Sequence, residues 1–127
     1  MRRPTSPLML AGVFAVVCAA RSGGDLLSRA PTEYRARVNP FASSQTAISA
    51  GHKLFLRECA QCHGRNGEGL GKAPPLSLPS TAGAPPGAIF WVLRNGSLWR
   101  GMRSFAHLPE PQRWQIVTYI KTLSSLP

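Results

Sequence analysis

The chain has 127 residues, enough for one small domain with short extensions but not for a multidomain enzyme. Fifteen Lys and Arg against five Asp and Glu give a formal net charge of +10 at pH 7. These basic residues are scattered and form no run, which argues against nucleic-acid binding and leaves two interpretations, attraction to an acidic partner or solubility alone.

The first twenty residues have the three-part pattern of a secretory signal peptide. Met1-Arg2-Arg3 is a positive start, an apolar run of thirteen residues follows from Leu8 to Ala20, and small residues come next. The run is shorter than the roughly 20 residues that a membrane-spanning helix needs, so we expect export and cleavage near Ala20. Two alternatives are an uncleaved anchor helix, which would hold the protein at a membrane, and lipid attachment at Cys18, which the bulky Val17 disfavours.

Residues 21–44 contain Gly23-Gly24, two prolines and several arginines, without a sustained apolar period. This composition predicts a flexible N-terminal arm or linker. We therefore divide the chain into a signal segment over 1–20, this arm over 21–44, and a single domain over 45–127. No internal repeat is present, so one module is expected.

Helical periodicity begins after Ser44 and predicts a helix of about fourteen residues that ends at Cys59. Its apolar face consists of Ala47, Ile48, Gly51, Leu54, Phe55 and Cys59. Gly51 is unfavourable inside a helix unless another backbone approaches closely there, so we expect such a close approach at this residue.

The five residues Cys59-Ala60-Gln61-Cys62-His63 form the motif C-x-x-C-H, which attaches a c-type haem. The two thiols add across the vinyl groups of the porphyrin, and the imidazole of His63 binds the iron as the proximal ligand. If cleavage removes Cys18, the two remaining cysteines are both used by the haem. Since haem attachment follows export, this motif and the signal segment together predict the periplasm.

Two cysteines at this spacing also occur in two other kinds of site. A thioredoxin-like dithiol needs a preceding strand and its first Cys at a helix N-terminus, whereas Cys59 follows a predicted helix. A zinc site needs four ligands, and His52 and His107 lack metal-pair spacing. Both alternatives are therefore weaker than haem attachment.

After the motif, residues 64–86 are rich in Gly and Pro and cannot form long regular structure. Such a segment could wrap around a flat apolar cofactor. Pro86–Arg94 is then predicted to be a short helix, and Glu110–Ser124 a longer one with Pro109 and Pro111 at its first turn.

An electron-transfer haem usually has a second axial ligand, and a Met opposite His raises the reduction potential. Met1 and Met9 fall within the signal segment, so Met102 is the only thioether expected in the mature protein. His107 is a rival because it lies close to Met102 in sequence. His52 is on the polar face of the motif helix, where a surface role is expected.

With these residues assembled, the chain over about 45–127 resembles a class I mono-haem cytochrome c of the bacterial, exported type. The resemblance implies an all-α cytochrome c fold, with three main helices and Gly/Pro-rich loops wrapped around one covalent haem c and its iron. In that family a Gly and a Phe precede the first haem Cys by eight and four positions, as Gly51 and Phe55 do. Trp114 and Tyr119 resemble the aromatic positions that pack where the two terminal helices cross.

The same resemblance implies roles for further residues around the haem. Pro75 matches a proline whose carbonyl accepts a hydrogen bond from the haem-ligating imidazole, and Leu76 would then touch the haem face. Met102 matches the second iron ligand, although Arg103 stands where that family commonly has Pro. The implied haem-binding set is Cys59, Cys62, His63, Pro75, Leu76 and Met102, with His63 and Met102 on the iron.

The predicted function is electron transfer between redox proteins with acidic docking surfaces, without catalysis of a substrate. The candidates for steering are Lys53, Arg65, Lys72, Arg100 and Arg103. One alternative with the same chemistry is an attached cytochrome subunit of a dehydrogenase or oxidase. Two remoter alternatives are a haem sensor or peroxidase with an open iron position, and a thiol–disulfide oxidoreductase.

Overall fold

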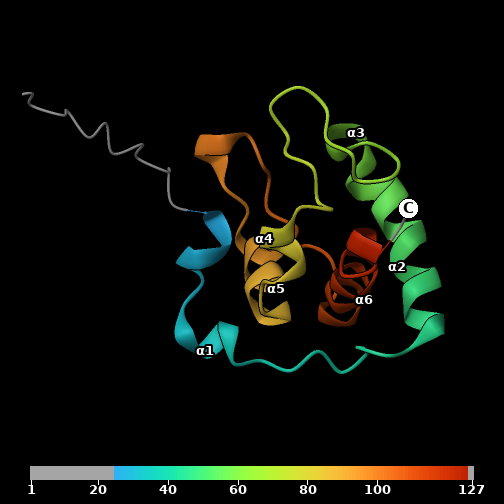
Figure 1. The fold of residues 1–127 in the computed structure, drawn as a ribbon. Coiled ribbons are helices and arrows are strands. Elements are labelled where there is room, and N and C mark those ends of the chain that lie inside the picture. Colours follow the sequence, from blue (N-terminus) through green and yellow to red (C-terminus); the bar gives the residue numbers. More distant parts are fainter. Residues whose placement is uncertain (1–24, 126–127) are drawn as a thin grey trace, which may run out of the picture.

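A computed structural model describes residues 25–125, in which every regular element is helical (Figure 1). The elements are η1 (Leu26–Arg29), α1 (Thr32–Arg35), α2 (Gln45–Glu58), α3 (Ala60–His63), α4 (Pro79–Ala82), α5 (Pro86–Asn95), η2 (Leu98–Arg100), α6 (Glu110–Ile120) and η3 (Leu123–Ser125). The all-α prediction is confirmed. The expected signal segment over 1–20, with Cys18 and the anchor alternative, lies outside the described residues.

Helix α2 is the element that leads into the cysteine motif. Ser44 caps it, because the Ser44 hydroxyl oxygen accepts a hydrogen bond from the backbone N–H of Ala47 at 3.1 Å. The helix then runs for fourteen residues with Leu54 and Phe55 on its buried face. The predicted helix and its apolar face are confirmed.

Helices α2 and α6 cross with their backbones in contact at Gly51. A Cβ atom at this position would lie 2.0 Å from the carbonyl oxygen of Gln115, so no larger residue fits without moving α6. Tyr119 of α6 packs beside the crossing, with its ring centroid 4.8 Å from that of His52 and 5.1 Å from that of Phe55. The crossing therefore fixes α2, and with it the motif, against the core.

On its other side α6 packs on α5 through aromatic rings. Trp114 stacks on Phe90 with a centroid distance of 4.2 Å and an interplanar angle of 20°. Trp114 thus joins α6 to α5, whereas Tyr119 faces α2. The predicted helix over Glu110–Ser124 ends at Ile120. Its last turn is replaced by η3, and the Thr122 hydroxyl donates to the carbonyl of Tyr119 at 2.6 Å.

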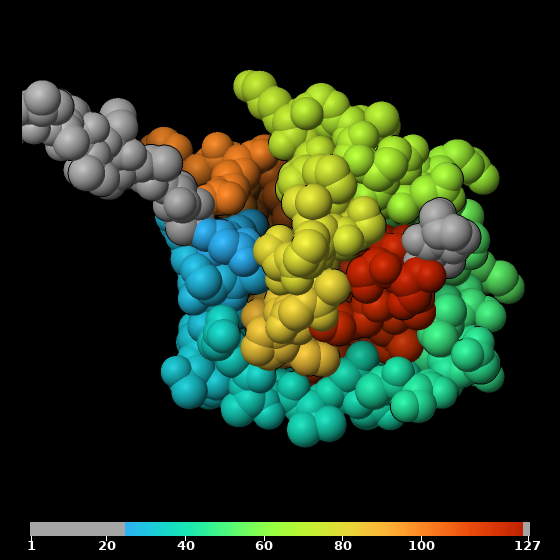
Figure 2. Space-filling view, viewed as in Figure 1, coloured from blue at the N-terminus to red at the C-terminus, as the bar shows by residue number. Residues whose placement is uncertain are grey.

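The segment 25–44, expected to be a flexible arm or linker, packs against the helices (Figures 1 and 2). A Cβ atom on Gly87 of α5 would lie 1.8 Å from the carbonyl oxygen of Tyr34, so α1 and α5 approach backbone to backbone. The side-chain amide of Asn39, which is only 6% exposed, donates to the Thr118 hydroxyl at 2.9 Å. Residues 25–44 are therefore an arm packed on the domain and not a free tether, because their few buried groups find partners that are distant in sequence.

The loop between α3 and α4 has no long regular structure, as its Gly and Pro content predicts. It folds back on the end of α3, with the backbone N–H of Gly69 donating to the carbonyl of His63 at 2.7 Å. The N–H of Leu76 donates to the carbonyl of Gly67 at 2.8 Å. In Figure 1 this loop extends beyond α3 and then returns to α4.

Among residues 25–125 we find no helix with the length and apolar character needed to cross a bilayer.

Candidate functional site

The two cysteines lie at the junction of α2 and α3. Cys59 is the C-cap of α2, with its N–H donating to the carbonyl of Phe55 at 2.8 Å, and it is also the N-cap of the single turn of α3. Cys62 comes three residues later, so this turn presents both side chains on one side. Cys59 is buried, Cys62 is exposed, and neither forms a disulfide.

The environment of Cys59 is unsuited to a redox dithiol. Burial, followed by the neighbouring Glu58 carboxylate, raises the pKa of the Cys59 thiol to about 12. A nucleophilic thiol needs the opposite shift, which a helix N-terminus or a nearby cation can provide. Cys59 instead follows the C-terminus of α2, so the geometry counts against a thioredoxin-like function.

His63 ends α3, and its imidazole Nδ1 lies 3.1 Å from the carbonyl oxygen of Pro74. Since a carbonyl can only accept, Nδ1 carries the proton and Nε2 has the lone pair available for a metal. Such a bond also orients the ring and increases its basicity toward iron. The imidazole is therefore prepared to ligate through one defined nitrogen.

This contact corrects the prediction for Pro75, since the acceptor is the carbonyl of Pro74. The two prolines are consecutive, and only the path of the loop decides which carbonyl faces the ring. A turn in which the N–H of Ala73 donates to the carbonyl of Leu70 at 3.0 Å precedes Pro74. Leu76 is half-buried against the core, and its expected contact with a haem face stays a prediction.

Met102 lies in a loop that is anchored on both sides. Backbone hydrogen bonds pair it with Ser97 in both directions, at 2.8 and 3.0 Å. Farther along, the N–H of the buried Phe105 donates to the carbonyl of Leu93 in α5 at 2.8 Å. Met102 is half-buried against the hydrophobic core, and η2 lies in the chain segment that connects Ser97 to Met102.

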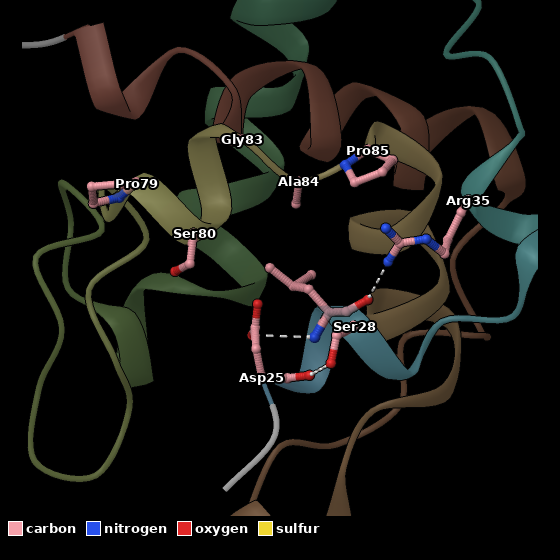
Figure 3. Close-up of a pocket in the computed structure, with 9 residues that line it drawn as sticks. Asp25, Ser28, Arg35, Pro79, Ser80, Gly83, Ala84 and Pro85 are labelled. Atoms are coloured by element: carbon pink, nitrogen blue, oxygen red, sulfur yellow. Dashed lines mark hydrogen bonds between the residues drawn. The ribbon is translucent and has the colours of Figure 1, made fainter. Parts of the chain in front are cut away.

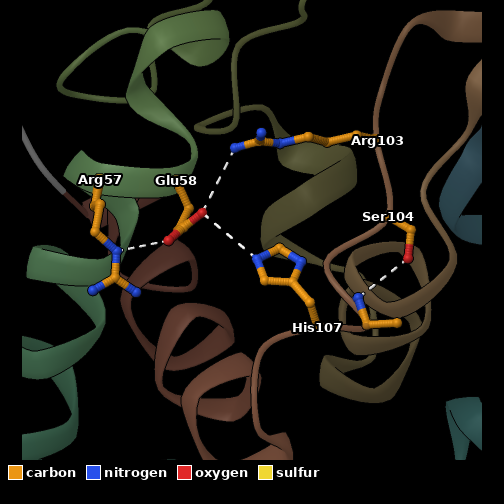
Figure 4. A network of polar contacts seen from close by, with 6 residues as sticks. Arg57, Glu58, Arg103, Ser104 and His107 are labelled. Carbon is orange, nitrogen blue, oxygen red and sulfur yellow. Dashed lines mark hydrogen bonds and ion pairs between the residues drawn. The ribbon is translucent and has the colours of Figure 1, made fainter.

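Glu58 connects the cysteine motif with the loop that contains Met102 (Figure 4). It directly precedes Cys59, and its Oε2 lies 3.6 Å from Nη2 of Arg103 and 4.0 Å from Nε2 of His107. The structure therefore brings together two segments that are about forty residues apart in sequence. Nothing in the residue pattern singled out Glu58, because its partners lie on another element.

The histidines considered as rivals to Met102 have other contacts. His107 faces the Glu58 carboxylate, and its side chain is 59% exposed. His52 stacks on Tyr119 beside the crossing of α2 and α6. These contacts favour Met102 over both rivals.

The donor set fits a covalently attached haem. Cys59 and Cys62 are free thiols, and the Nδ1 contact of His63 leaves its Nε2 available. In contrast, the described part of the chain contains no group of three or more His, Cys, Asp or Glu side chains that could hold a metal ion. A zinc site therefore lacks its ligands there.

A pocket of about 270 Å³ lies apart from these residues, beside η1 and α4 (Figure 3). Its two charged side chains are already hydrogen-bonded to Leu27 of η1: Asp25 accepts from the N–H of Leu27 at 3.3 Å, and Arg35 donates to the carbonyl of Leu27 at 3.4 Å. None of the motif residues lines this pocket. We therefore place the candidate site at the cysteine motif.

Comparison with known proteins gives a family match and matches among solved structures. A family model described as "Cytochrome C oxidase, cbb3-type, subunit III" matches residues 46–120. Among solved structures, the chain is similar to cytochrome cL from the marine methylotrophic bacterium Methylophaga aminisulfidivorans MPT, with 24% identity and a TM-score of 0.54. That match covers 65% of this chain and 59% of the other, so the chain spans less than two thirds of that protein. No curated protein matches in sequence.

Proposed function

The chain belongs to the cytochrome c family described as cytochrome c oxidase, cbb3-type, subunit III, and from this premise we propose an electron carrier ligated by His63 and Met102. Membership implies one covalently attached haem c with its iron. The likeness to cytochrome cL agrees with a cytochrome c fold. The family transfers electrons through its haem; the axial ligands, the partners and the compartment are parts of our proposal.

The observation that carries the proposal is the hydrogen bond between Nδ1 of His63 and the carbonyl of Pro74, at 3.1 Å. It commits one nitrogen of the ring and leaves Nε2 for the iron, directly after two free thiols. Cys59 and Cys62 would form the two thioether bonds. When bound, the haem supplies a one-electron couple between ferrous and ferric iron.

Met102 is proposed as the second iron ligand. Its pairing with Ser97 and its partial burial support a defined position for the thioether. The thioether would hold the iron together with His63, so the protein would have no open position for an exogenous ligand. It would also raise the reduction potential, as Met does opposite His in cytochromes.

We propose that the protein works in the periplasm and exchanges electrons with redox proteins that have acidic docking surfaces. Without Arg2 and Arg3 of the signal segment, 13 basic residues remain against 5 acidic ones, and this formal charge of +8 supports such attraction, which would accelerate encounter at low ionic strength. We further propose that it catalyses no reaction on a substrate. An attached subunit of an oxidase or dehydrogenase is a second candidate, because the family description names an oxidase subunit.

The test is Met102→Ala in the haem-loaded protein. We expect loss of the far-red Met–iron absorption band, a lower reduction potential and new binding of carbon monoxide by the reduced protein. His107→Ala is the matched control and should keep the band. An unchanged spectrum and potential in Met102→Ala would contradict the ligand assignment. Carbon monoxide binding by the unmodified protein would favour a sensor or peroxidase.

A further inference from the structure

The residue after Met102 is Arg103, where the family commonly has Pro. A proline there would restrict the backbone of the loop through its fixed φ angle and so reduce the freedom of the neighbouring Met. Arg103 has no such backbone restriction. Any comparable restraint on this loop must therefore come from its side chain and from the contacts around it.

The Arg103 side chain extends back toward the cysteine motif. Its Nη2 lies 3.6 Å from Oε2 of Glu58, and its guanidinium carbon lies 5.1 Å from the centroid of the Phe105 ring. Phe105 is buried and hydrogen-bonded to Leu93 of α5. The guanidinium thus rests on a fixed ring at one side and approaches a carboxylate at the other.

Glu58 is suited to act as a fixed anchor for this guanidinium. Its side chain is only 13% exposed, and it occupies the last position of α2, directly before Cys59. Oε1 accepts a hydrogen bond from Nε of Arg57 at 2.6 Å, and Oε2 faces both Arg103 and His107. One half-buried carboxylate therefore contacts side chains from both segments of the candidate site (Figure 4).

We propose that Glu58 is a positioning residue that, through Arg103 and His107, holds the Met102 loop against the cysteine end of α2. In this chain the ion pair with Arg103 and the contact with His107 supply the restraint that a proline after Met102 supplies through the backbone. The proposal deepens the proposed function and rests on it, because the loop matters for the haem only if Met102 is an iron ligand. Exposed ion pairs are individually weak, and Arg103 is 64% exposed, so a modest effect is expected.

The experiment compares Glu58→Gln with Glu33→Gln in the haem-loaded protein. Gln preserves the shape of Glu58 and removes its charge, and Glu33 makes the same charge change on the exposed face of α1. We expect cyanide to bind the ferric Glu58→Gln protein about threefold faster or more, since the Met102 loop must open first. Amide hydrogen exchange over 97–105 should accelerate by a similar factor, while Glu33→Gln changes neither rate.

A rescue variant separates positioning from general destabilisation. Adding Arg103→Pro to Glu58→Gln should return both rates toward those of the unmodified protein, because the backbone then supplies the restraint. Unchanged rates in Glu58→Gln, or an equal acceleration in Glu33→Gln, would overturn the proposal. So would an absence of rescue.

The two proposals can fail separately. If the Met102→Ala test shows that Met102 is not an iron ligand, hydrogen exchange over 97–105 still reports whether Glu58 holds the loop. Faster exchange in Glu58→Gln then supports the restraint, and equal exchange overturns it. If Glu58→Gln fails to fold, Arg103→Gln removes the same ion pair from the exposed side, with the same expected acceleration and the same overturning result.

Discussion

The two sides of the candidate haem site are held in different ways. The proximal side, Cys59 to His63, continues directly from α2, which is locked against α6 at Gly51. The distal side, residues 97–107, is held by a few backbone hydrogen bonds and by contacts of the exposed Arg103 and His107 side chains with Glu58. Helix packing therefore holds the proximal side in place, and weaker polar contacts hold the distal side. We expect the distal side to open first when the protein is perturbed.

Gly51→Ala is expected to have the largest effect, because it breaks the support of the proximal side. The added Cβ would meet the carbonyl oxygen of Gln115 at 2.0 Å and force α2 and α6 apart. We expect the free energy of unfolding to fall by about 3 kcal/mol. Guanidinium denaturation followed by circular dichroism measures this change.

Lys53→Ala is the matched control, since Lys53 is an exposed position on the same helix. It should change the unfolding free energy by less than about 0.5 kcal/mol. An equally mild result for Gly51→Ala would contradict the close crossing of α2 and α6.

Asn39→Ala should have the next largest effect. It removes the hydrogen bond to Thr118 of α6, and both side chains are buried. We expect the free energy of unfolding to fall by about 1–2 kcal/mol, because the Thr118 hydroxyl loses a buried partner. Thermal denaturation measures this change. A loss of this size would show that segment 25–44 belongs to the tightly packed part of the molecule, with α2 and α6. No loss would instead support the flexible arm.

Ser104→Ala acts on the distal side alone. The Ser104 hydroxyl donates to the carbonyl of Arg94 at 2.6 Å and accepts from the N–H of Ala106 at 3.1 Å. Because Ser104 is exposed, we expect a loss of only about 0.5–1 kcal/mol. Hydrogen exchange should accelerate over 97–107 and stay unchanged over α2. Equal acceleration in both regions would contradict their separate support.

The smallest effect concerns the exposed ion pair between Arg37 and Glu110. The hydrogen bond from Arg37 lowers the pKa of the Glu110 carboxyl below its usual value. The stabilisation is therefore present above the ordinary pKa of Glu and is lost as pH falls through the lowered one. Since both side chains are more than a third exposed, we expect at most about 0.5 kcal/mol. Denaturation of Glu110→Gln at pH 7 and at low pH checks the sign: the difference from the unmodified protein should vanish in acid.

Much of the helical framework was predictable because its causes are local. The periodicity after Ser44 and the spacing of apolar residues after Pro109 predicted the two helices that cross, and the family resemblance implied their contact at Gly51. The last turn of α6 was overpredicted: Lys121 caps the helix, and its side-chain ammonium donates to the carbonyls of Ala82 and Ala84. That contact joins elements far apart in sequence, so no local pattern could indicate it.

The candidate site divides in the same way. C-x-x-C-H is a continuous motif whose chemistry depends on spacing along one helical turn, so the haem chemistry, the all-α class and the main helices could be inferred from the order of residues. Three features depend on the folded structure: Pro74 rather than Pro75 faces His63, segment 25–44 packs on α5, and Glu58 meets Arg103. Each of these contacts joins segments that are separated in the sequence. Packing of the whole fold decides where such segments meet, so the neighbouring residues in the chain do not reveal it.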